Sequence, residues 1–460
     1  MTHAVRPPRM LTARMQPDPL VLLRSRGYVR LLVLAALIGV PVSAAAYGFL
    51  ELVTWLEDQL FTELPDTLGF ASTPAWWPLP LLVISGFLTA MAIRRLPGTG
   101  GHPPSEGFKA SGALPPVELP GVFLAALATL SFGAVLGPEA PLIALGSGLG
   151  ALAVRLAAPG SPSQATAMIA AAGSFAAISS LLGSPLVGAF LLLEAAGLGG
   201  PMLGVVLVPG LLAAGVGTLI FVGLDDLTGL GTFSLTVSGL PEFGSPTLAM
   251  FGWAIAFGLA AAVLGRGIHL LAVALRARVE PRMVLLMPVV GAGVALLAIG
   301  FSEATDHDAS EVLFSGQDAL GPLISSPADW TVGALLLLVL CKSLAYALSL
   351  SSFRGGPVFP AVFVGAAGGM AAAGLPGLSL VPAVAMGIGA MTVAMLNLPL
   401  TSTLLASLLI GADGLAVMPL VIVAVVVAYV ASAHLAPAPE EAPPEPTGAP
   451  AAPHTAVPAG

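Results

Sequence analysis

Charged residues are scarce in this sequence. They make up 9% of its 460 residues, whereas a soluble domain carries about 25%. Water is therefore not the main solvent of this chain, and we expect a lipid bilayer, not nucleic acid, as its large partner. Hydrophobic residues make up 57% and the mean hydropathy is +0.97. At about 20 residues for each spanning helix, the chain has room for about a dozen membrane segments.

Alternation of polar and apolar residues is also missing. The apolar runs are long and rich in Ala, Leu and Gly, without the two-residue period of an outer-membrane barrel. Backbone polar groups inside a bilayer must be paired within the protein, so the remaining solution is a bundle of helices. We therefore predict an all-α, polytopic membrane protein.

Cysteine is almost absent. The single Cys341 can form no internal disulfide and stands in an apolar segment, where we expect it to be a small buried side chain. The sequence also lacks an H-E-x-x-H pattern and a phosphate-binding loop, so we expect neither a metal nor a cofactor.

The few charges are unevenly placed. Much of the net charge of -8 comes from polar connections and the C-terminal tail. Basic residues precede the first long apolar run and recur in one later connection, and the positive-inside bias places both regions, together with the two termini, in the cytoplasm. No short apolar region with a cleavage site follows, so we expect no cleaved signal peptide. The basic residues are Arg6, Arg9, Arg14, Arg24, Arg26 and Arg30, and later Arg276, Arg278 and Arg282.

Glycine, proline and charge divide the apolar runs into two series. We predict a basic cytoplasmic segment at 1–27, a first membrane repeat at 28–223, a linker at 224–246, a second repeat at 247–435 and a disordered Pro/Ala/Glu-rich tail at 436–460. Expected helices lie near 28–55, 76–95, 117–135, 138–157, 163–181, 185–198 and 201–223, and then near 247–275, 283–301, 309–324, 329–350, 357–374, 378–394, 398–411 and 414–435.

The two series share a pattern of helix starts. In the first, Gly137-Pro138 opens a helix and Ser184-Pro185 opens another; in the second, Gly356-Pro357 and Leu398-Pro399 do so at similar spacing. Short apolar helices broken by Gly and Pro in corresponding places of two halves point to a binding site near the middle of the membrane. We therefore predict an internal duplication.

Such helix starts are suited to an anion. Unpaired backbone N–H groups and the helix dipole give each N-terminus about half a positive charge, which binds an anion without holding it as tightly as a fixed cation would. Glu139 lies in the first of these starts, and an ionisable residue at membrane depth is a functional hypothesis by default. Its carboxylate would compete with an anion when ionised and release the path when protonated. The alternative is a glutamate that merely complements the helix dipole.

These segments resemble the CLC family of chloride channels and proton/chloride exchangers. Residues 133–141 and 145–150 are similar to the family's G-K/R-E-G-P motif and its continuation, with Glu139 on the gating glutamate. Residues 98–107 resemble the G-S-G-I-P region, and 341–365 the helix and loop that end in G-x-F-x-P. The resemblance covers about residues 28–435. It implies two repeats of inverted topology, a homodimer with one pore per subunit, and an anion pathway at Gly100, Gly101, Gly137, Pro138, Ala140, Pro141, Gly355, Gly356, Val358 and Phe359.

The chain departs from the family pattern in the first half. Pro138 replaces the usual basic residue before the glutamate, and Ala140 replaces the glycine after it. Gly100 occupies the position of the family's pore serine, and the nearest residue with a hydroxyl group is Thr99. One hydroxyl donor is therefore expected to be missing from the pathway.

Departures in the second half concern the remaining donors. Pro357 falls on a position whose N–H contacts the anion in the family, and proline has no N–H. Val358 and Phe359 keep theirs. The family's pore tyrosine has no counterpart, and we assign Tyr429, inside the last helix, to packing.

Four ionisable residues have open roles. Where exchangers of the family carry an internal proton glutamate, the chain has Ala195, and Glu194 beside it remains a candidate proton group although one residue turns a helix by about 100°. Arg354 either adds positive potential to the pathway or pairs with lipid or a carboxylate. Lys342 has a structural or pathway role. His102 is either a titratable group of the cytoplasmic vestibule or incidental.

We conclude that this is an anion transport protein and not an enzyme, with a chloride channel slightly favoured. The alternatives are a proton-coupled exchanger of chloride or fluoride, and a CLC-like membrane scaffold that does not conduct. An intramembrane serine protease is suggested weakly by Gly146-Ser147-Gly148, but small residues at this spacing more often allow close helix packing.

Overall fold

The computed structural model describes residues 21, 23–108, 112–197, 202–228, 237 and 240–436. This part of the chain is built from helices and turns, and the one sheet-like contact recorded in it is an isolated bridge between Gly137 and Gly356. The prediction of an all-α protein is confirmed. The first half contains α2 (Arg26–Asp58), α3 (Leu64–Thr67), α4 (Pro78–Arg95), α5 (Leu119–Leu130), α6 (Glu139–Ala157), α7 (Ser163–Leu181), α8 (Pro185–Ala195) and α9 (Met202–Thr228). The second contains α10 (Leu248–Val279), α11 (Met283–Thr305), α12 (Gln317–Ser325), α13 (Val332–Ser352), α14 (Val358–Ala372), α15 (Leu380–Leu396), α16 (Pro399–Leu409) and α17 (Gly414–Leu435).

Helix length separates spanning from broken helices. Within the described residues, 8 helical segments are long and apolar enough to cross a membrane. Five other apolar segments have only 10–17 residues, fewer than the ~20 that a hydrocarbon core of about 30 Å requires. They are Pro116–Leu130, Pro185–Ala195, Val358–Ala372, Leu380–Leu396 and Pro399–Leu409, and they occur in both halves as the sequence predicts.

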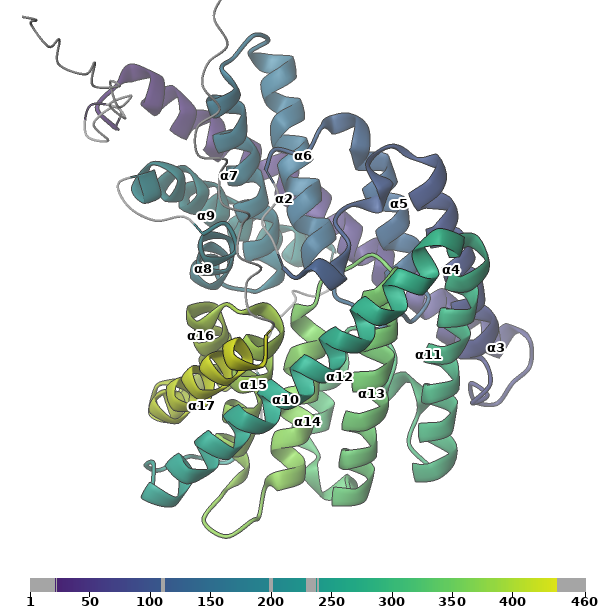
Figure 1. The fold of residues 1–460 in the computed structure, drawn as a ribbon. Coiled ribbons are helices and arrows are strands. Elements are labelled where there is room, and N and C mark those ends of the chain that lie inside the picture. The colour runs from purple at the N-terminus through teal and green to yellow at the C-terminus, as the bar shows by residue number, and fades with distance from the viewer. Residues whose placement is uncertain are drawn as a thin grey trace, which may run out of the picture.

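Helix contacts repeat between the halves. In the first half α6 packs on α7, α7 on α8 and α9, and α2 on α9; in the second α14 packs on α15, α15 on α16 and α17, and α10 on α17. The halves meet where α4 packs on α11 and α8 on α16. Figure 1 shows the first half in purple to teal above the second half in green to yellow, with α10 crossing in front. The same set of helix contacts in both halves supports the predicted duplication.

The helix starts of the two halves match in backbone conformation. Gly183 and Asn397 have φ values of 60° and 58°, in the left-handed region that glycine and asparagine tolerate best. Each ends one helix, and Pro185 or Pro399 then opens the next at its first position. Proline suits this position because its missing N–H would be unpaired there.

Glycine pairs bring helices into close contact at matching places. A Cβ atom on Gly146 of α6 would collide with the carbonyl of Gly173 on α7, and a Cβ on Gly173 with that of Gly146. The same reciprocal contact joins Gly365 of α14 and Gly387 of α15. Gly146 therefore permits close packing, as expected for small residues between membrane helices.

One predicted helix is shorter than expected. The sequence indicates a helix near 309–324, but α12 begins only at Gln317. Phe314 and Gly316 have φ values of 56° and 81°, which a right-handed helix cannot contain. The carbonyl oxygens of residues 311–313 accept hydrogen bonds from the ammonium group of Lys342 instead of from helical N–H groups.

The predicted linker begins later than expected. Helix α9 continues through residues 224–228 to Thr228, whose hydroxyl lies 2.8 Å from the hydroxyl of Tyr47. This contact with α2 holds the last turn of α9. Residues 1–20 of the N-terminal segment and 437–460 of the tail lie outside the described residues.

The glycine contact between α14 and α15 can be tested by adding one methyl group. Gly365→Ala places that methyl against the Gly387 carbonyl, and we expect the free energy of unfolding to fall by about 1–3 kcal/mol. Gly368→Ala is the matched control on the same helix, since a Cβ there meets nothing within 4 Å. Thermal unfolding in detergent measures both variants. Equal destabilisation by the two would contradict the close contact.

Candidate functional site

The two halves are joined by a pair of backbone hydrogen bonds at the middle of the fold. Gly137 N donates to Gly356 O at 2.8 Å, and Gly356 N donates to Gly137 O at 2.6 Å. Pro138 and Pro357 follow as the N-caps of α6 and α14, with φ and ψ of -81° and -1° and of -91° and -2° respectively. Both prolines lie one residue before the first helical residue. The sequence had predicted proline as the first helical residue itself. The two helix starts predicted at Gly137-Pro138 and Gly356-Pro357 are thus brought side by side with matching conformations.

Glu139 lies at this junction. Its side chain has no exposed surface, and its Oε1 accepts a hydrogen bond of 2.9 Å from Phe359 N of the other half. No hydrogen-bond partner for Oε2 is found among the described residues. Carbon atoms added to Gly137 or Gly356 would overlap the carboxylate, so glycine at both positions makes the space that the carboxylate occupies.

Two cavities adjoin the segment around Glu139, one lined by residues that precede it in the chain and one by residues that follow it. Ala140 and Pro141 face a cavity of about 60 Å³, and Leu136 and Pro138 face another of about 40 Å³. A water molecule needs about 10–15 Å³ of such volume, so each cavity can hold a small ion or a few waters. The buried carboxylate therefore belongs to a segment whose two flanking parts line separate cavities.

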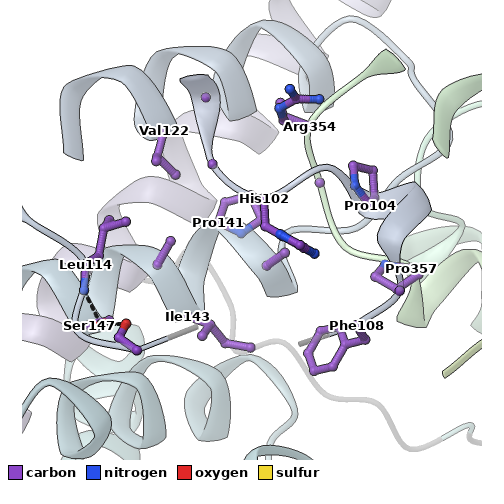
Figure 2. A pocket seen from close by; sticks show the side chains of 17 residues that line it. His102, Pro104, Phe108, Leu114, Val122, Pro141, Ile143, Ser147, Arg354 and Pro357 are labelled. Carbon is purple, nitrogen blue, oxygen red and sulfur yellow. Dashed lines mark hydrogen bonds between the residues drawn. The ribbon is translucent and has the colours of Figure 1, made fainter. Parts of the chain in front are cut away.

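The larger of these two cavities is lined by half of the predicted pathway residues. Figure 2 shows Arg354 and His102 on loops that line it, with Ser147 at its other end. Val358 is buried in the first turn of α14 and does not line this cavity. The predicted residues in its wall are Gly100, Gly101, His102, Ala140, Pro141, Arg354, Gly355 and Pro357.

Arg354 connects the two halves next to this cavity. Its Nε donates to Thr99 O at 3.2 Å, its backbone N donates to the Thr129 hydroxyl at 3.2 Å, and its Nη1 donates to the Ser352 and Phe353 carbonyls. These recorded bonds go to neutral groups, so the guanidinium charge is not cancelled by a carboxylate in them. Thr99 is exposed and does not line the cavity, so it does not replace the missing hydroxyl.

His102 stands in a short chain of charges. Its Nε2 lies 3.6 Å from Glu106 Oε2, and Glu106 Oε1 lies 2.8 Å from Arg276 Nη1. Arg276 Nε lies 3.4 Å from Glu280 Oε2. This chain ties the loop at 102–106 to the end of α10, in the region where the positive-inside bias predicts the cytoplasm.

Glu194 lies away from the cavity, at the contact between α8 and α16. Its Oε1 accepts from Leu400 N at 2.8 Å, and its Oε2 accepts from Thr401 N at 2.8 Å and from the Thr401 hydroxyl at 2.6 Å. A carboxylate at this position caps the unpaired N–H groups of α16 and complements its dipole. The geometry therefore favours a link between the repeats over a mobile proton group.

The structure also shows the surroundings of Cys341, Tyr429 and Ser147. Cys341 is buried and unpaired, and Tyr429 is 41% exposed on α17 and does not line the cavity. The Ser147 hydroxyl accepts from Leu114 N at 3.1 Å and donates to Gly112 O at 3.3 Å, so it holds a loop and is not paired with a histidine in these bonds.

Sequence reasoning missed two buried hydroxyls on α13. The Tyr346 hydroxyl donates to Pro357 O at 2.7 Å, and Ser349 Oγ accepts from Val135 N at 3.0 Å. The signal available was their spacing with Lys342 in a helix of mostly apolar residues. It could not be interpreted from the sequence because their partners lie in irregular loops.

Comparison with known proteins decides the family. Residues 86–433 match the family described as voltage gated chloride channel. The chain belongs to this family. YfeO of Escherichia coli O7:K1, described as a candidate ion-transport protein, is 28% identical over 357 residues, which cover 75% of this chain and 80% of that protein. YfeO of Escherichia fergusonii matches with the same identity and coverage.

Solved structures of the family share the fold. A slow cyanobacterial Cl⁻/H⁺ antiporter superposes with a TM-score of 0.71 at 20% identity, over 88% of this chain and 95% of that chain. A CLC-type fluoride/proton antiporter superposes with a TM-score of 0.67 at 19% identity, with the same coverage. A eukaryotic CLC transporter gives 0.67 at 16% identity, over 89% of this chain and 72% of that chain. The predicted CLC-type fold is confirmed, and the chain is a multi-pass membrane protein of a family that transports anions.

The capping role of Glu194 predicts a stability effect. Glu194→Ala leaves two N–H groups of α16 without their acceptor, and we expect a loss of about 1–2 kcal/mol in the free energy of unfolding. Glu303→Ala, at an exposed glutamate near the end of α11, is the control and should stay within about 0.5 kcal/mol. Thermal unfolding of both purified variants is the measurement. Unchanged stability of the Glu194 variant would contradict the capping role.

Proposed function

We propose that this protein conducts small inorganic anions, chloride foremost, along a path that Glu139 opens and closes. The observation that carries the proposal is the bond from Phe359 N to the Glu139 carboxylate. A backbone N–H that binds a carboxylate at the junction of two helix starts is equally suited to bind an anion. The carboxylate and the anion therefore compete for one position, and movement or protonation of Glu139 frees it.

The residues of the path are assigned on the same grounds. Gly100, Gly101, Ala140, Pro141 and Gly355 form the wall of the vestibule on one side of Glu139. Gly137, Pro138, Gly356, Val358 and Phe359 form the filter around it. Because loop 102–106 is bound to Arg276, we assign the vestibule to the cytoplasmic side, where Arg354 adds positive potential.

The residues at the C-terminal end of α8 favour a passive channel over an exchanger. Ala195 stands where exchangers of the family carry the internal proton glutamate, and both oxygens of Glu194 are bound to α16. Proton-coupled exchange of chloride or fluoride is the second candidate, because the similar solved structures include antiporters of both anions. A scaffold without transport is disfavoured by the buried Glu139 carboxylate and by the cavities that adjoin its segment.

We further propose a homodimer with one path in each subunit. Leu186 and Leu400, the second residues of α8 and α16, are 61% and 55% exposed, and Leu415 at the start of α17 is 80% exposed. These helices form one continuous edge of the molecule, with α8 packed on α16 and α16 on α17. Helices α8 and α16 have 11 residues each and are too short to span a bilayer, so we expect a second copy of the chain to cover this apolar edge.

Efflux from proteoliposomes tests the function directly. Chloride and fluoride efflux are recorded together with internal pH. Anion efflux without proton movement supports the channel, whereas efflux that drives protons against their gradient establishes the exchanger. Absence of efflux for every anion would contradict the proposal and leave the scaffold.

Glu139→Gln tests the gate. Glutamine cannot ionise, and a hydrogen bond to a charged group contributes about 1.5–3 kcal/mol, so its loss should raise chloride flux at high pH by about tenfold or more and remove the pH dependence. Glu303→Gln is the control for the loss of one negative charge. Flux unchanged at every pH in the Glu139 variant would refute the gate.

Arg354→Gln tests the vestibule potential. A unit charge about 4 Å from an anion is worth about 1 kcal/mol in water, so we expect chloride flux at low chloride concentration to fall about fivefold. Arg278→Gln is the control, since that exposed side chain is bonded to Ala274 O within its own helix. The dependence of flux on chloride concentration separates weaker binding from slower transport. Equal losses in both variants would show that Arg354 has no special role.

A further inference from the structure

Helix α13 carries three buried polar side chains on one face. Lys342, Tyr346 and Ser349 follow one another at spacings of four and three residues, which places them on the same side of a helix. Lys342 and Tyr346 have no exposed surface, and neither does Ser349. Burying such groups costs free energy unless each is hydrogen-bonded, so their partners explain why they are present.

Ser349 and Tyr346 hold the two filter segments. Val135 N, two residues before Gly137, donates to Ser349 Oγ at 3.0 Å. The Tyr346 hydroxyl donates at 2.7 Å to the carbonyl of Pro357, the residue after Gly356. One helix is therefore bonded next to each end of the Gly137–Gly356 bridge.

Lys342 holds a third irregular segment. Its Nζ donates to the carbonyls of Glu311 and Leu313 at 2.9 Å and of Val312 at 3.3 Å. The adjoining Phe314 N donates to Gly133 O at 3.2 Å. The ammonium group thus fixes a turn that is bonded to the same first-half loop that Ser349 holds.

These bonds pair backbone N–H and C=O groups of irregular segments that lie at membrane depth. Irregular backbone there is tolerated only when each of its N–H and C=O groups finds a partner inside the protein. Without Tyr346, the Pro357 carbonyl would lose its recorded donor, and an unbonded carbonyl can turn its negative end toward the path. Without Ser349, the Val135 N–H would lose its acceptor, and the loop that carries Glu139 could shift against Phe359.

We propose that Tyr346 and Ser349 are positioning residues that set the separation of the two filter segments, and thereby which anions pass, with Lys342 fixing the loop behind them. This inference rests on the anion transport proposed above. Selectivity is the property affected because the donors of the filter are backbone groups, and their relative positions decide how well an anion of given size is bound.

The test compares anion preference and not flux alone. Wild type, Tyr346→Phe and Ser349→Ala are reconstituted in liposomes, and the efflux rates of fluoride, chloride and nitrate are measured on the same preparations. One unmade buried hydrogen bond changes an equilibrium about fivefold or more, so we expect the fluoride/chloride or nitrate/chloride ratio to change by that factor. The ratio is independent of the amount of folded protein, which a purely structural role would change.

A matched control lies on the same helix. Ser343 is also buried, and its hydroxyl has no hydrogen-bond partner among the described residues. Ser343→Ala therefore removes the same atom without releasing a filter segment, and the ratios should stay as in the wild type. Ser349→Thr keeps an acceptor for Val135 N and should restore the wild-type ratios.

The outcomes separate this inference from the proposed function. Wild-type efflux with unchanged ratios in Ser349→Ala and Tyr346→Phe would overturn the positioning role and leave anion transport standing. Equal ratio changes in Ser343→Ala and Ser349→Ala would also overturn it, because a general loosening of α13 would then explain both. Wild-type protein without efflux of any anion would overturn the proposed function and this inference together. If Tyr346→Phe does not fold, Ser349→Ala and Ser349→Thr decide the question by themselves.

Discussion

Two hydrogen bonds between Gly137 and Gly356 are the constraint on which the site depends. They join the halves of the chain as a short antiparallel bridge in a protein otherwise built from helices. Both positions must be glycine, because a Cβ at either one would overlap the carboxylate of Glu139. The bridge therefore determines at once how the halves meet and where the buried carboxylate can lie.

A bridge of irregular backbone inside a membrane needs support on every side. Thr129 accepts from Arg354 N, Ser349 accepts from Val135 N, and Tyr346 donates to Pro357 O. These bonds come from helices of both halves. Since water is absent from the hydrocarbon core, each unmade bond there would cost several kcal/mol. The polar residues of α5 and α13 are thus explained by the loops that they complete.

The proposed anion path relies on the backbone N–H groups of two matching helix starts. Pro138 and Pro357 supply no N–H, so the first donors at each helix start come from the residues that follow, and Phe359 N is bound to the Glu139 carboxylate. Partial charges of this kind bind an anion without trapping it. The missing pore serine and tyrosine of the family pattern leave a wall formed mostly by glycine, proline and apolar side chains, with Arg354 and His102 as its charged or titratable members.

The sequence by itself determined the membrane environment, the helical class, the duplication and the place of Glu139 at a helix start, because composition, segment length and the order of Gly and Pro are local properties. The sequence-based prediction of a helix near 309–324 was wrong, because residues in the left-handed conformation and hydrogen bonds to the ammonium group of Lys342 interrupt the helix there. Only the tertiary structure decided that Glu139 is bound to Phe359, that Glu194 caps α16 and that Tyr346 and Ser349 are bonded to the loops beside the Gly137–Gly356 bridge. Their partners are up to 220 residues away in the chain, and a local pattern carries no information on which distant backbone group will meet a given side chain.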